Sequence, residues 1–548
     1  MKGKIKYIGL FLTLLLLSRC ANMVTPTGGP KDVTPPVVTV AKPENNNVNF
    51  DGKKIEITFD EYVTLNNASQ QVLISPPMTE KPDIKLSNKT VVIKFKESLL
   101  PNTTYTIHFG EAVKDLHEGN VFKDYVYSFA TGEVLDTLTL AGKVLDAESQ
   151  KATTDLYVML YDGDSDSLCE QPTRRAPDFI AKTDKDGKFQ FQGLPQKKFL
   201  VFALNDMNSN LYYDLPNETV AFLDTLVVPN DSIELVLYSF AEADTNQMLL
   251  EKKLVEEGLL RFVFRHPALD VTIEPVSALA DSFQLAEVWS KEHDTLCWYF
   301  TPNVMDSLRV DIHSDSDTLI NNNILFDLNF KGAKPRNERV AKTIKVGNNL
   351  KNNLLMPGED LVLRFSEPVI DLLMHDTSTL VAGADTTYNT MVFEQRDAYG
   401  LEYCLANQVD DTVSYEIHMS DSVFYSVRNR TNGAFNLKFK RAGDDDLGNI
   451  IIKVYPPEGT QVVVQLLNNK GNVLDERVID TASKVEFRQL IPEKYQLKAI
   501  FDDDRNGKWS TGNFHAFFLP EKTVDYKDVL EVKKGWDIDL DEPWELKK

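Results

Sequence analysis

Cysteine is scarce in this chain, and acidic residues outnumber basic ones. Of 548 residues only Cys20, Cys169, Cys297 and Cys404 are cysteines, and they lie too far apart for a disulfide framework or a cysteine metal site. The formal net charge of −23 repels nucleic acids and anionic lipid head groups. We therefore expect no nucleic acid among the partners, which are cations, glycans or other envelope proteins.

Catalytic patterns are also missing. The eight histidines are scattered without the spacing of a zinc protease, and neither a Gly-x-Ser-x-Gly sequence nor a phosphate-binding glycine loop occurs. Paired carboxylates carry no information in a chain with 82 acidic residues, because any two of them can be chosen. We predict that the protein is not an enzyme and has no catalytic residues.

No apolar run reaches the roughly 20 residues that a membrane-spanning helix needs. The run nearest the N-terminus covers residues 8–17 and follows Lys2, Lys4 and Lys6. This order of charge and hydrophobicity is typical of a secretory signal peptide. We therefore predict that residues 1–19 are a signal peptide and that the protein is exported.

The sequence at the end of this run is Leu17-Ser18-Arg19-Cys20, which resembles a lipobox. The resemblance implies cleavage before Cys20 and acylation of Cys20, which anchors the chain to the membrane. Arg19 departs from the pattern, because a small residue normally precedes the cysteine, and the alternative is a soluble exported protein with an incidental cysteine. Loss of residues 1–19 removes four basic residues and changes the formal charge from −23 to −27.

The rest of the chain has the pattern of an all-β protein. Residues 20–36 are rich in proline and glycine and are predicted to be a tether. Beyond them, short runs alternate apolar and polar residues, as in Lys54-Ile55-Glu56-Ile57-Thr58-Phe59, and turn residues separate the runs. The length fits about five domains of sandwich size. We predict tandem β-sandwich domains.

Four sequence blocks stand out near the N-terminus. They are Pro35-Pro36, Ile57-Thr58-Phe59-Asp60-Glu61-Tyr62-Val63, Leu100-Pro101-Asn102-Thr103-Thr104-Tyr105-Thr106-Ile107 and Tyr127-Ser128-Phe129-Ala130-Thr131-Gly132. With them, residues 33–131 resemble the bacterial Ig-like domain first described in surface-layer proteins. We expect Phe59 and Val63 to face its core and Pro101-Asn102 to form a turn. The preceding Thr25-Pro26-Thr27-Gly28-Gly29-Pro30-Lys31-Asp32 is similar to the tether of a family of Bacteroidetes lipoproteins.

Related patterns return later in the chain. Leu361-Val362-Leu363-Arg364-Phe365-Ser366-Glu367-Pro368-Val369 repeats the block that begins at Ile55, so residues 340–441 are predicted to be a second Ig-like domain. Residues 240–338 echo the same plan more weakly and are predicted to be a degenerate Ig-like sandwich. Within them, residues 247–257 have the spacing of a short helix, although the β context favours an extended linker.

A second kind of repeat links residues 137–232 with residues 447–542. The first copy carries Thr183-Asp184-Lys185-Asp186-Gly187-Lys188-Phe189-Gln190-Phe191 and Gly193-Leu194-Pro195, and the second keeps Val485-Glu486-Phe487 and Leu490-Ile491-Pro492. Both resemble the carboxypeptidase-regulatory or prealbumin-like β-sandwich. The resemblance implies a hairpin at Asp186-Gly187 and a strand from Phe199 to Ala203.

Both copies place a polar loop directly after the same strand. Asp206, Asn208 and Asn210 align with Asp502, Asp504 and Asn506, and Gly507 follows in the second copy, where the first has Leu211. Alternate oxygen side chains are typical of the first half of a calcium-binding loop. It is half a loop only, because position twelve is Asn513. The alternative is a turn whose Asp and Asn side chains bond their own backbone.

Aromatic residues offer a weaker signal. Trp509 lies just beyond the second polar loop and is either a platform for a sugar ring or a half-buried residue that closes the sandwich edge. Trp289, Trp298, Trp536 and Trp544 show no spacing that defines a groove, so we expect them in cores or interfaces. Tripeptides such as Asp294-Thr295-Leu296 resemble O-glycosylation acceptors of exported Bacteroidetes proteins, but they also fit a loop that enters a strand.

Together these features predict an outer-membrane lipoprotein on the periplasmic or surface face. Its predicted role is that of a non-enzymatic structural or protein-interaction rod. A surface glycan-binding adhesin is the alternative, because sandwich folds serve both purposes.

Overall fold

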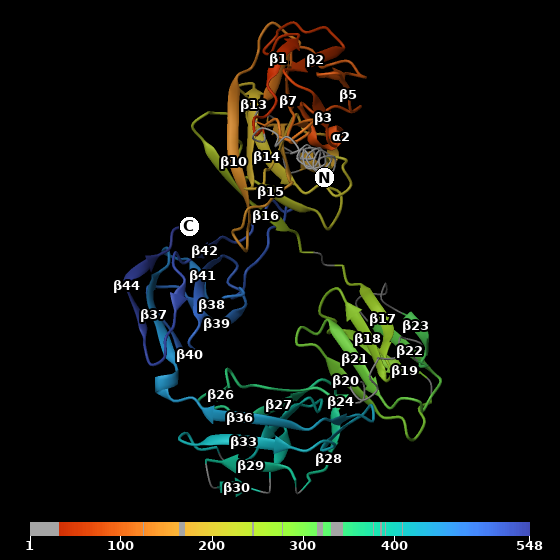
Figure 1. Ribbon diagram of the computed structural model, residues 1–548, viewed down its shortest axis with the longest axis vertical. Coiled ribbons are helices and arrows are strands. Elements are labelled where there is room, and N and C mark those ends of the chain that lie inside the picture. Colours follow the sequence, from red (N-terminus) through yellow and green to blue (C-terminus); the bar gives the residue numbers. More distant parts are fainter. Residues whose placement is uncertain are drawn as a thin grey trace, which may run out of the picture. The chain divides into compact units, whose positions relative to one another are not determined.

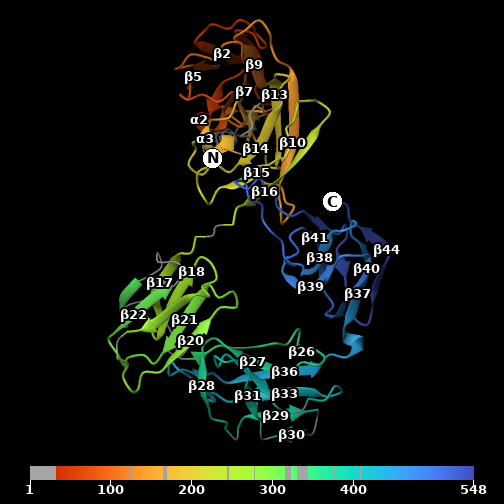
Figure 2. The same cartoon turned by 180° about the vertical axis from the view of Figure 1, so that it is seen from behind.

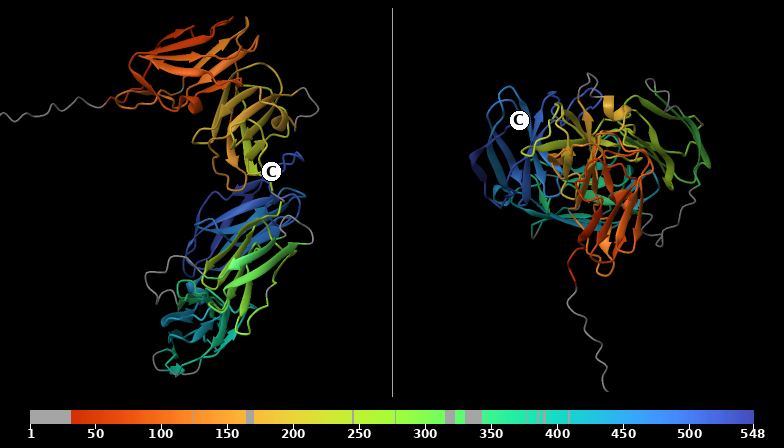
Figure 3. Two further views of the ribbon diagram at one scale, coloured as in Figure 1. Left: turned by 90° about the vertical axis from the view of Figure 1, so that its right-hand side faces the viewer. Right: turned by 90° about the horizontal axis from the view of Figure 1, so that it is seen from above.

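A computed structural model describes residues 32–548 except positions 124, 164–169, 244–245, 277, 315–321, 330–342, 376, 384–385, 389–390 and 408. The predicted signal peptide, the lipidation site Cys20 and the tether up to residue 31 lie outside the described residues, as does Cys169. Strand arrows are the main regular elements drawn in these views, joined by loops and with few short helices (Figures 2 and 3). The predicted all-β fold is therefore confirmed.

The chain divides into two compact units. Unit 1 comprises Met1–Asp146, Lys151–Phe240 and Phe514–Leu519, and unit 2 comprises Ala147–Gln150, Ala241–Asn513 and Pro520–Lys548. The described residues contain five large clusters of buried hydrophobic side chains, two in unit 1 and three in unit 2. Each cluster takes its residues from the strands and loops of one sandwich, and the strands of each sandwich are labelled in Figure 1.

The first sandwich of unit 1 packs a four-stranded sheet against a three-stranded one. The first sheet has the order β1 (Val38–Lys42), β2 (Lys54–Phe59), β6 (Thr90–Lys94), β5 (Asp83–Ser87), and the second has the order β4 (Leu73–Ser75), β7 (Thr104–His108), β9 (Val126–Ala130). A further pair joins β3 (Val63–Leu65) to β8 (Val113–Asp115), and α2 (Ala68–Gln71) precedes β4. Phe59 and Val63 are buried and Asn102 lies in a turn with φ of 50°, as predicted.

The second sandwich of unit 1 is built on one seven-stranded sheet. Its order is β12 (Phe179–Lys182), β11 (Tyr157–Asp162), β14 (Phe199–Leu204), β15 (Thr219–Phe222), β16 (Glu234–Ala241), β10 (Leu138–Asp146), β13 (Lys188–Leu194). The short helix α3 (Gln171–Arg174) lies between β11 and β12. Unit 1 also includes Phe514, whose ring packs 4.9 Å from that of Phe202 between centroids.

Unit 2 begins with a sandwich whose strand order matches the first one. Its sheets have the orders β17 (Leu249–Glu256), β18 (Leu259–Phe264), β21 (Thr295–Phe300), β20 (Leu285–Trp289) and β19 (Val271–Pro275), β22 (Ser307–Ser314), β23 (Asn322–Asp327). The fully buried Trp298 lies in its core.

The next sandwich of unit 2 has three sheets. They have the orders β25 (Val346–Asn348), β27 (Val362–Phe365), β32 (Glu402–Leu405), β31 (Phe393–Gln395); β26 (Leu354–Leu355), β36 (Phe435–Arg441), β33 (Ser414–Met419), β29 (Thr379–Ala382), β30 (Thr386–Tyr388); and β24 (Thr343–Ile344), β35 (Thr431–Asn432), β34 (Phe424–Ser426), β28 (Val369–Leu372). The order β1-β2-β6-β5 of the first sandwich thus recurs as β17-β18-β21-β20 and as β25-β27-β32-β31.

The C-terminal sandwich follows the 3₁₀ turn η3 (Asp444–Asp446). Its sheets have the orders β40 (Ser483–Leu490), β37 (Gly448–Tyr455), β44 (Ile538–Glu545) and β39 (Val473–Ile479), β38 (Gln461–Asn468), β41 (Lys494–Asp502), β42 (Thr523–Asp525), with β43 (Leu530–Glu531) on β41. In it β37 pairs antiparallel with β40 and parallel with β44. The second sandwich has the same arrangement, since β10 pairs antiparallel with β13 and parallel with β16.

Two local expectations were wrong. The segment 247–257 is neither a helix nor a linker, because Leu249–Glu256 forms β17 and pairs with β18. Asp186-Gly187 turns the chain with a φ of 73° at Gly187, but it does not close a hairpin. The strands on either side, β12 and β13, pair with β11 and β10 and lie at opposite ends of the sheet order.

Candidate metal centre

The candidate site lies where β41 ends, at Asp502. This residue is 1% exposed, and its two carboxylate oxygens accept hydrogen bonds from the backbone N–H groups of Asn506 (3.0 Å) and Gly507 (2.9 Å). The Gln461 side chain donates a third bond at 2.6 Å. Asp502 therefore folds the chain back on itself as soon as it leaves the sheet.

A glycine makes this tight turn possible. Gly507 has a φ of 77°, and two residues earlier Arg505 has a φ of 58°. Left-handed conformations are free of steric cost for glycine only, so Gly507 is the residue that suits this position. The turn brings Asp504 back beside the end of β41.

Asp504 is held by its own loop. The Ser510 hydroxyl donates to its carboxylate at 2.7 Å and the Asn506 side-chain amide donates at 2.8 Å. The Ser510 hydrogen bond is the main reason that the pKa of Asp504 lies below the usual aspartate value. Asp504 is thus an exposed carboxylate that stays ionised at neutral pH.

Glu521 is the third acidic residue and is 2% exposed. Its two oxygens accept backbone N–H bonds from Asp503 (2.7 Å) and Ser510 (2.9 Å). Burial raises the pKa of Glu521 above the usual glutamate value, although these N–H donors oppose the shift. The backbone therefore holds the Glu521 carboxylate in place. Because this carboxylate is buried, its ionisation is costly without a nearby cation.

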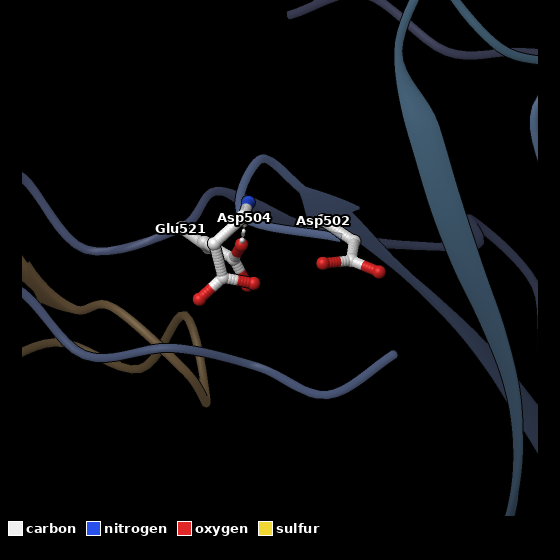
Figure 4. A group of neighbouring side chains, drawn as sticks. All are labelled: Asp502, Asp504 and Glu521. Carbon is white, nitrogen blue, oxygen red and sulfur yellow. Dashed lines mark hydrogen bonds between the residues drawn. The ribbon is translucent and has the colours of Figure 1, made fainter. Parts of the chain in front are cut away.

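Asp502, Asp504 and Glu521 offer oxygens that all lie within 4.8 Å of one another (Figure 4). Among the described residues this is the only such group of three acidic, histidine or cysteine side chains. Carboxylate, amide and hydroxyl oxygens are hard ligands, which suit calcium or magnesium better than zinc or copper. The residues present therefore fit a hard divalent cation, with Asn506 and Ser510 beside the three acids.

The first copy has the same backbone frame. Asp206 accepts bonds from the N–H groups of Asn210 (3.2 Å) and Leu211 (2.8 Å), in the positions of Asn506 and Gly507. The fully buried Glu218 accepts the Met207 N–H at 3.1 Å, as Glu521 accepts that of Asp503. The two loops are thus built on the same hydrogen bonds.

The first loop differs in how its side chains are satisfied. Asn208 and Asn210 each donate a side-chain N–H to Asp214, at 3.0 Å and 2.7 Å. The amides satisfy both oxygens of this carboxylate by hydrogen bonding, and the acids of the first loop form no cluster of three among the described residues. Leu211 has a φ of 62°, a strained conformation for a branched side chain.

The sequence named three of the candidate residues in the second loop and missed one. It placed Asp502, Asp504 and Asn506 in one polar loop, and Asp206, Asn208 and Asn210 in the other. It missed Glu521, which lies 19 positions beyond Asp502. Glu521 offers the third carboxylate of the group, which Asn513, at position twelve of the loop, lacks. The available signal was a glutamate at the start of the next strand in each copy, Glu218 before β15 and Glu521 before β42.

Trp509 closes the loop from one side. Its indole N–H donates to the Glu521 carbonyl oxygen at 2.9 Å, and the ring is half-buried. This position favours the structural interpretation over a sugar platform. Among the other tryptophans, Trp298 and Trp544 are buried as expected, but Trp536 is 71% exposed and is not a core residue.

Comparison with known proteins supports one of the assigned domains. A family model described as the bacterial Ig-like domain matches residues 32–131. Residues 32–131 are therefore similar to a bacterial Ig-like domain. This segment is the first sandwich of unit 1, so the predicted resemblance is confirmed there. No curated protein matches the chain.

Several solved structures of surface proteins are distantly similar. The N-terminal part of the bacterial surface-layer protein SbsC is 15% identical with a TM-score of 0.14, over 38% of this chain and 44% of that one. The Bacillus anthracis TIE protein is 8% identical with a TM-score of 0.15, over 95% of this chain and 76% of that one. The major pilin subunit BcpA of Bacillus cereus is 10% identical with a TM-score of 0.15, over 74% of this chain and 99% of that one. This chain spans less than half of the SbsC fragment. TM-scores this low mean that the chains do not superimpose as wholes, and no function follows from them.

No helix in the described part of the chain has the length and apolar content needed to cross a bilayer.

Cys297 and Cys404 are free thiols.

Proposed function

We propose that this protein is a non-enzymatic structural or scaffolding component of the bacterial cell envelope, an outer-membrane lipoprotein anchored through Cys20. The observation that carries the proposal is the repetition of two sandwich topologies, each with its own closed core. Repeated rigid domains suit a spacer that presents binding surfaces away from a membrane.

A buried ion pair supports a role that needs fixed geometry. Arg428 is 5% exposed, and its guanidinium donates to Glu367 at 2.7 Å and to Glu256 at 2.9 Å. Glu367 belongs to the same sandwich as Arg428, whereas Glu256 ends β17 in the preceding sandwich of unit 2. Charge-assisted bonds at a buried arginine are strong and directional. This joint resists bending between the two sandwiches.

Calcium is the ion that we propose for the Asp502 loop. Bound there, it would offset most of the negative charge of Asp502, Asp504 and Glu521 and stiffen the connection from β41 to β42. For Trp509 we favour a structural role over the glycan-binding alternative, because its indole N–H is bonded to the Glu521 carbonyl and its ring is half-buried.

Protease shaving of intact cells, followed by membrane fractionation, tests the proposed location. The wild-type chain and a Cys20→Ser variant are compared by blotting. We expect the wild-type chain in the outer-membrane fraction and the variant in the soluble fraction. If both fractionate alike, the lipid anchor is wrong.

Gentle crosslinking in the same cells tests the scaffolding role. We expect one discrete protein partner to be crosslinked to the chain, and the same crosslinked product to form when the chain is expressed at a low level. If no partner is crosslinked and purified chain instead gives a glycan-array signal, the adhesin alternative replaces the scaffold.

A further inference from the structure

Within unit 2, the third sandwich (β17 to β23) meets the fourth (β24 to β36) at a joint made by two turns. The first turn is the tip of the β17–β18 hairpin, where Gly258 has a φ of 77° and a Cβ would meet the Arg428 side chain at 3.2 Å. The second turn carries Arg428, whose Nε donates to the Glu257 carbonyl at 2.9 Å. Glu367, which accepts a bond from Arg428, is buried, and so is Val427. The joint thus packs a glycine turn against an ion pair and an apolar residue.

The first sandwich has a matching face. In it the Leu116 N–H donates to the Tyr62 carbonyl at 2.9 Å, and in the fourth sandwich Val427 makes the same bond to Pro368 at 3.2 Å. Each bond links the residue after β8 or β34 to the residue before β3 or β28, and these strands pair in both sandwiches. Tyr62 and Leu116 are half-exposed, whereas Val427 is buried under the third sandwich. The face that forms a joint in one sandwich is therefore bare in the other.

The acid at the bare face lacks a cation. On this match Glu61 stands where the fourth sandwich has Glu367, and His117 stands where it has an arginine. Within the described part of the chain, Glu61 has no hydrogen-bond or ion-pair partner. Burial raises the pKa of Glu61, and so do the neighbouring acids Asp115, Asp60, Asp32 and Glu118. The nearby Lys89 is bonded to a backbone carbonyl and forms no ion pair with these acids. The face is therefore negative and suits a basic group.

Exposed apolar side chains surround this negative face. Val33 and Val37 are exposed on the segment that enters the sandwich. The Val37 N–H donates to the Asp60 carboxylate at 2.9 Å, and the Asn120 amide donates to the two carbonyls that flank Val33 in sequence. Both valines thus lie at the same end of the sandwich as the half-exposed tyrosine and leucine. A group of exposed apolar residues with a polar surround marks an interaction site.

A complementary surface lies on the C-terminal sandwich, at the tip of the β38–β39 hairpin. Gly471 has a φ of 82°, and no atom lies within 4 Å of a Cβ placed on it, so this turn is open. Lys470 beside it is exposed and has no ion-pair partner among the described residues. The following strand exposes Val473, Leu474 and Val478. The tip therefore combines a glycine turn, a free cation and apolar side chains, where the β17–β18 tip has a glutamate before its glycine.

We propose that the bare face of the first sandwich docks the β38–β39 tip of a second copy of this chain. Lys470 of one copy pairs with Glu61 of the other, and Gly471 allows close approach, as the glycine of the β17–β18 tip does in the joint. The exposed apolar side chains of β39 pack against Tyr62 and Leu116. The tip and the face are different surfaces, so the contact is heterologous and joins copies head to tail.

The acidity of the whole chain does not prevent this contact. Although the net charge is −23, the Debye length at physiological ionic strength is about 8 Å, so distant charges of two copies are screened while the pair in contact is not. The inference rests on the proposed scaffolding role and deepens it, because it names a second copy as a partner.

The test is sedimentation velocity of the chain from residue 20 onward, with Cys20→Ser so that no lipid drives association. We expect the average mass to rise with concentration. Lys470→Glu and Glu61→Lys should each weaken self-association at least tenfold, because each variant places like charges in contact. Lys291→Glu, which reverses an exposed lysine in the turn between β20 and β21, is the matched control and leaves association unchanged.

Mixing the two variants separates a contact from a folding defect. Glu61→Lys and Lys470→Glu chains fail to associate alone, but every contact between the two variants joins opposite charges, so the mixture should regain association. The proposal is overturned if the wild-type chain stays monomeric, if Lys291→Glu acts like Lys470→Glu, or if the mixture does not associate. Binding of a monomeric chain to phosphatidylethanolamine vesicles would assign the face to a membrane and also overturn it. None of these results changes the cell fractionation of the Cys20→Ser variant, so the two proposals fail separately.

Discussion

The polar loops after β14 and β41 show how one backbone frame supports two different chemical environments. In each loop an aspartate after the strand, Asp206 or Asp502, accepts hydrogen bonds from two backbone N–H groups. A buried glutamate, Glu218 or Glu521, accepts the N–H of the residue that follows the aspartate. In the first loop the amides of Asn208 and Asn210 donate hydrogen bonds to Asp214, whereas the second loop brings Asp504 next to Glu521. Two exchanges at matching positions, Asn208 for Asp504 and Asp214 for Ser510, move the exposed carboxylate from the end of the loop to a place beside the buried glutamate.

The largest expected effect comes from the feature that the loops share. Glu521→Ala should destabilise the C-terminal sandwich by about 2–3 kcal/mol, because buried N–H donors lose their acceptor. Glu218→Ala should cost a similar amount in the second sandwich. Urea unfolding followed by sandwich-specific hydrogen exchange measures both. A loss below about 0.5 kcal/mol in either variant would mean that the buried glutamate does not brace its loop.

Calcium should separate the two copies. An ion at 100 times its dissociation constant stabilises the folded state by about 2.7 kcal/mol, so calcium should raise the melting temperature of the C-terminal sandwich and chelator should reverse the rise. Asp504→Asn should abolish this response. Asn208→Asp restores a carboxylate at the matching place in the first copy and should create a new response there. Equal responses from both wild-type loops would contradict the comparison.

Backbone strain gives a smaller contrast. Leu211→Gly should stabilise the second sandwich by about 1 kcal/mol, because it removes the cost of a left-handed leucine. Gly507→Leu should destabilise the C-terminal sandwich by a similar amount. Thermal melts of the two variants in the presence of chelator measure the pair. Effects of the same sign in both variants would show that contacts of the leucine side chain outweigh its backbone strain.

The smallest expected effect is on pH dependence. Burial raises the pKa of Glu521, so without metal its contribution to stability is full below the unfolded value near 4.5 and is lost as the pH rises through the higher folded value. Chelated wild-type protein should therefore lose more stability between pH 4.5 and 7 than Glu521→Gln. Urea midpoints across this range provide the measurement. Identical slopes would mean that Glu521 carries no burial cost.

The sequence predicted much of the fold because its signals are local. Alternation in Lys54–Phe59 marks a strand whatever lies around it, and the Asp-x-Asp-x-Asn spacing around Asp502 describes a turn closed by its own backbone. The strand β17 was not recognised, because Leu250 and Leu254, four positions apart, also fit a helical spacing and only pairing with β18 decides between strand and helix. Local patterns predict elements, but pairing partners select among them.

The candidate site was only half visible for the same reason. Asp502 and Asp504 lie in one turn, whereas Glu521 reaches them after a long excursion of the chain that no fixed spacing describes.

Titration of calcium into the purified chain by isothermal calorimetry tests the contrast between the loops most directly. The account predicts one site per chain, which Asp504→Asn removes and Asn208→Ala leaves intact. Two equivalent sites, or none, would contradict it.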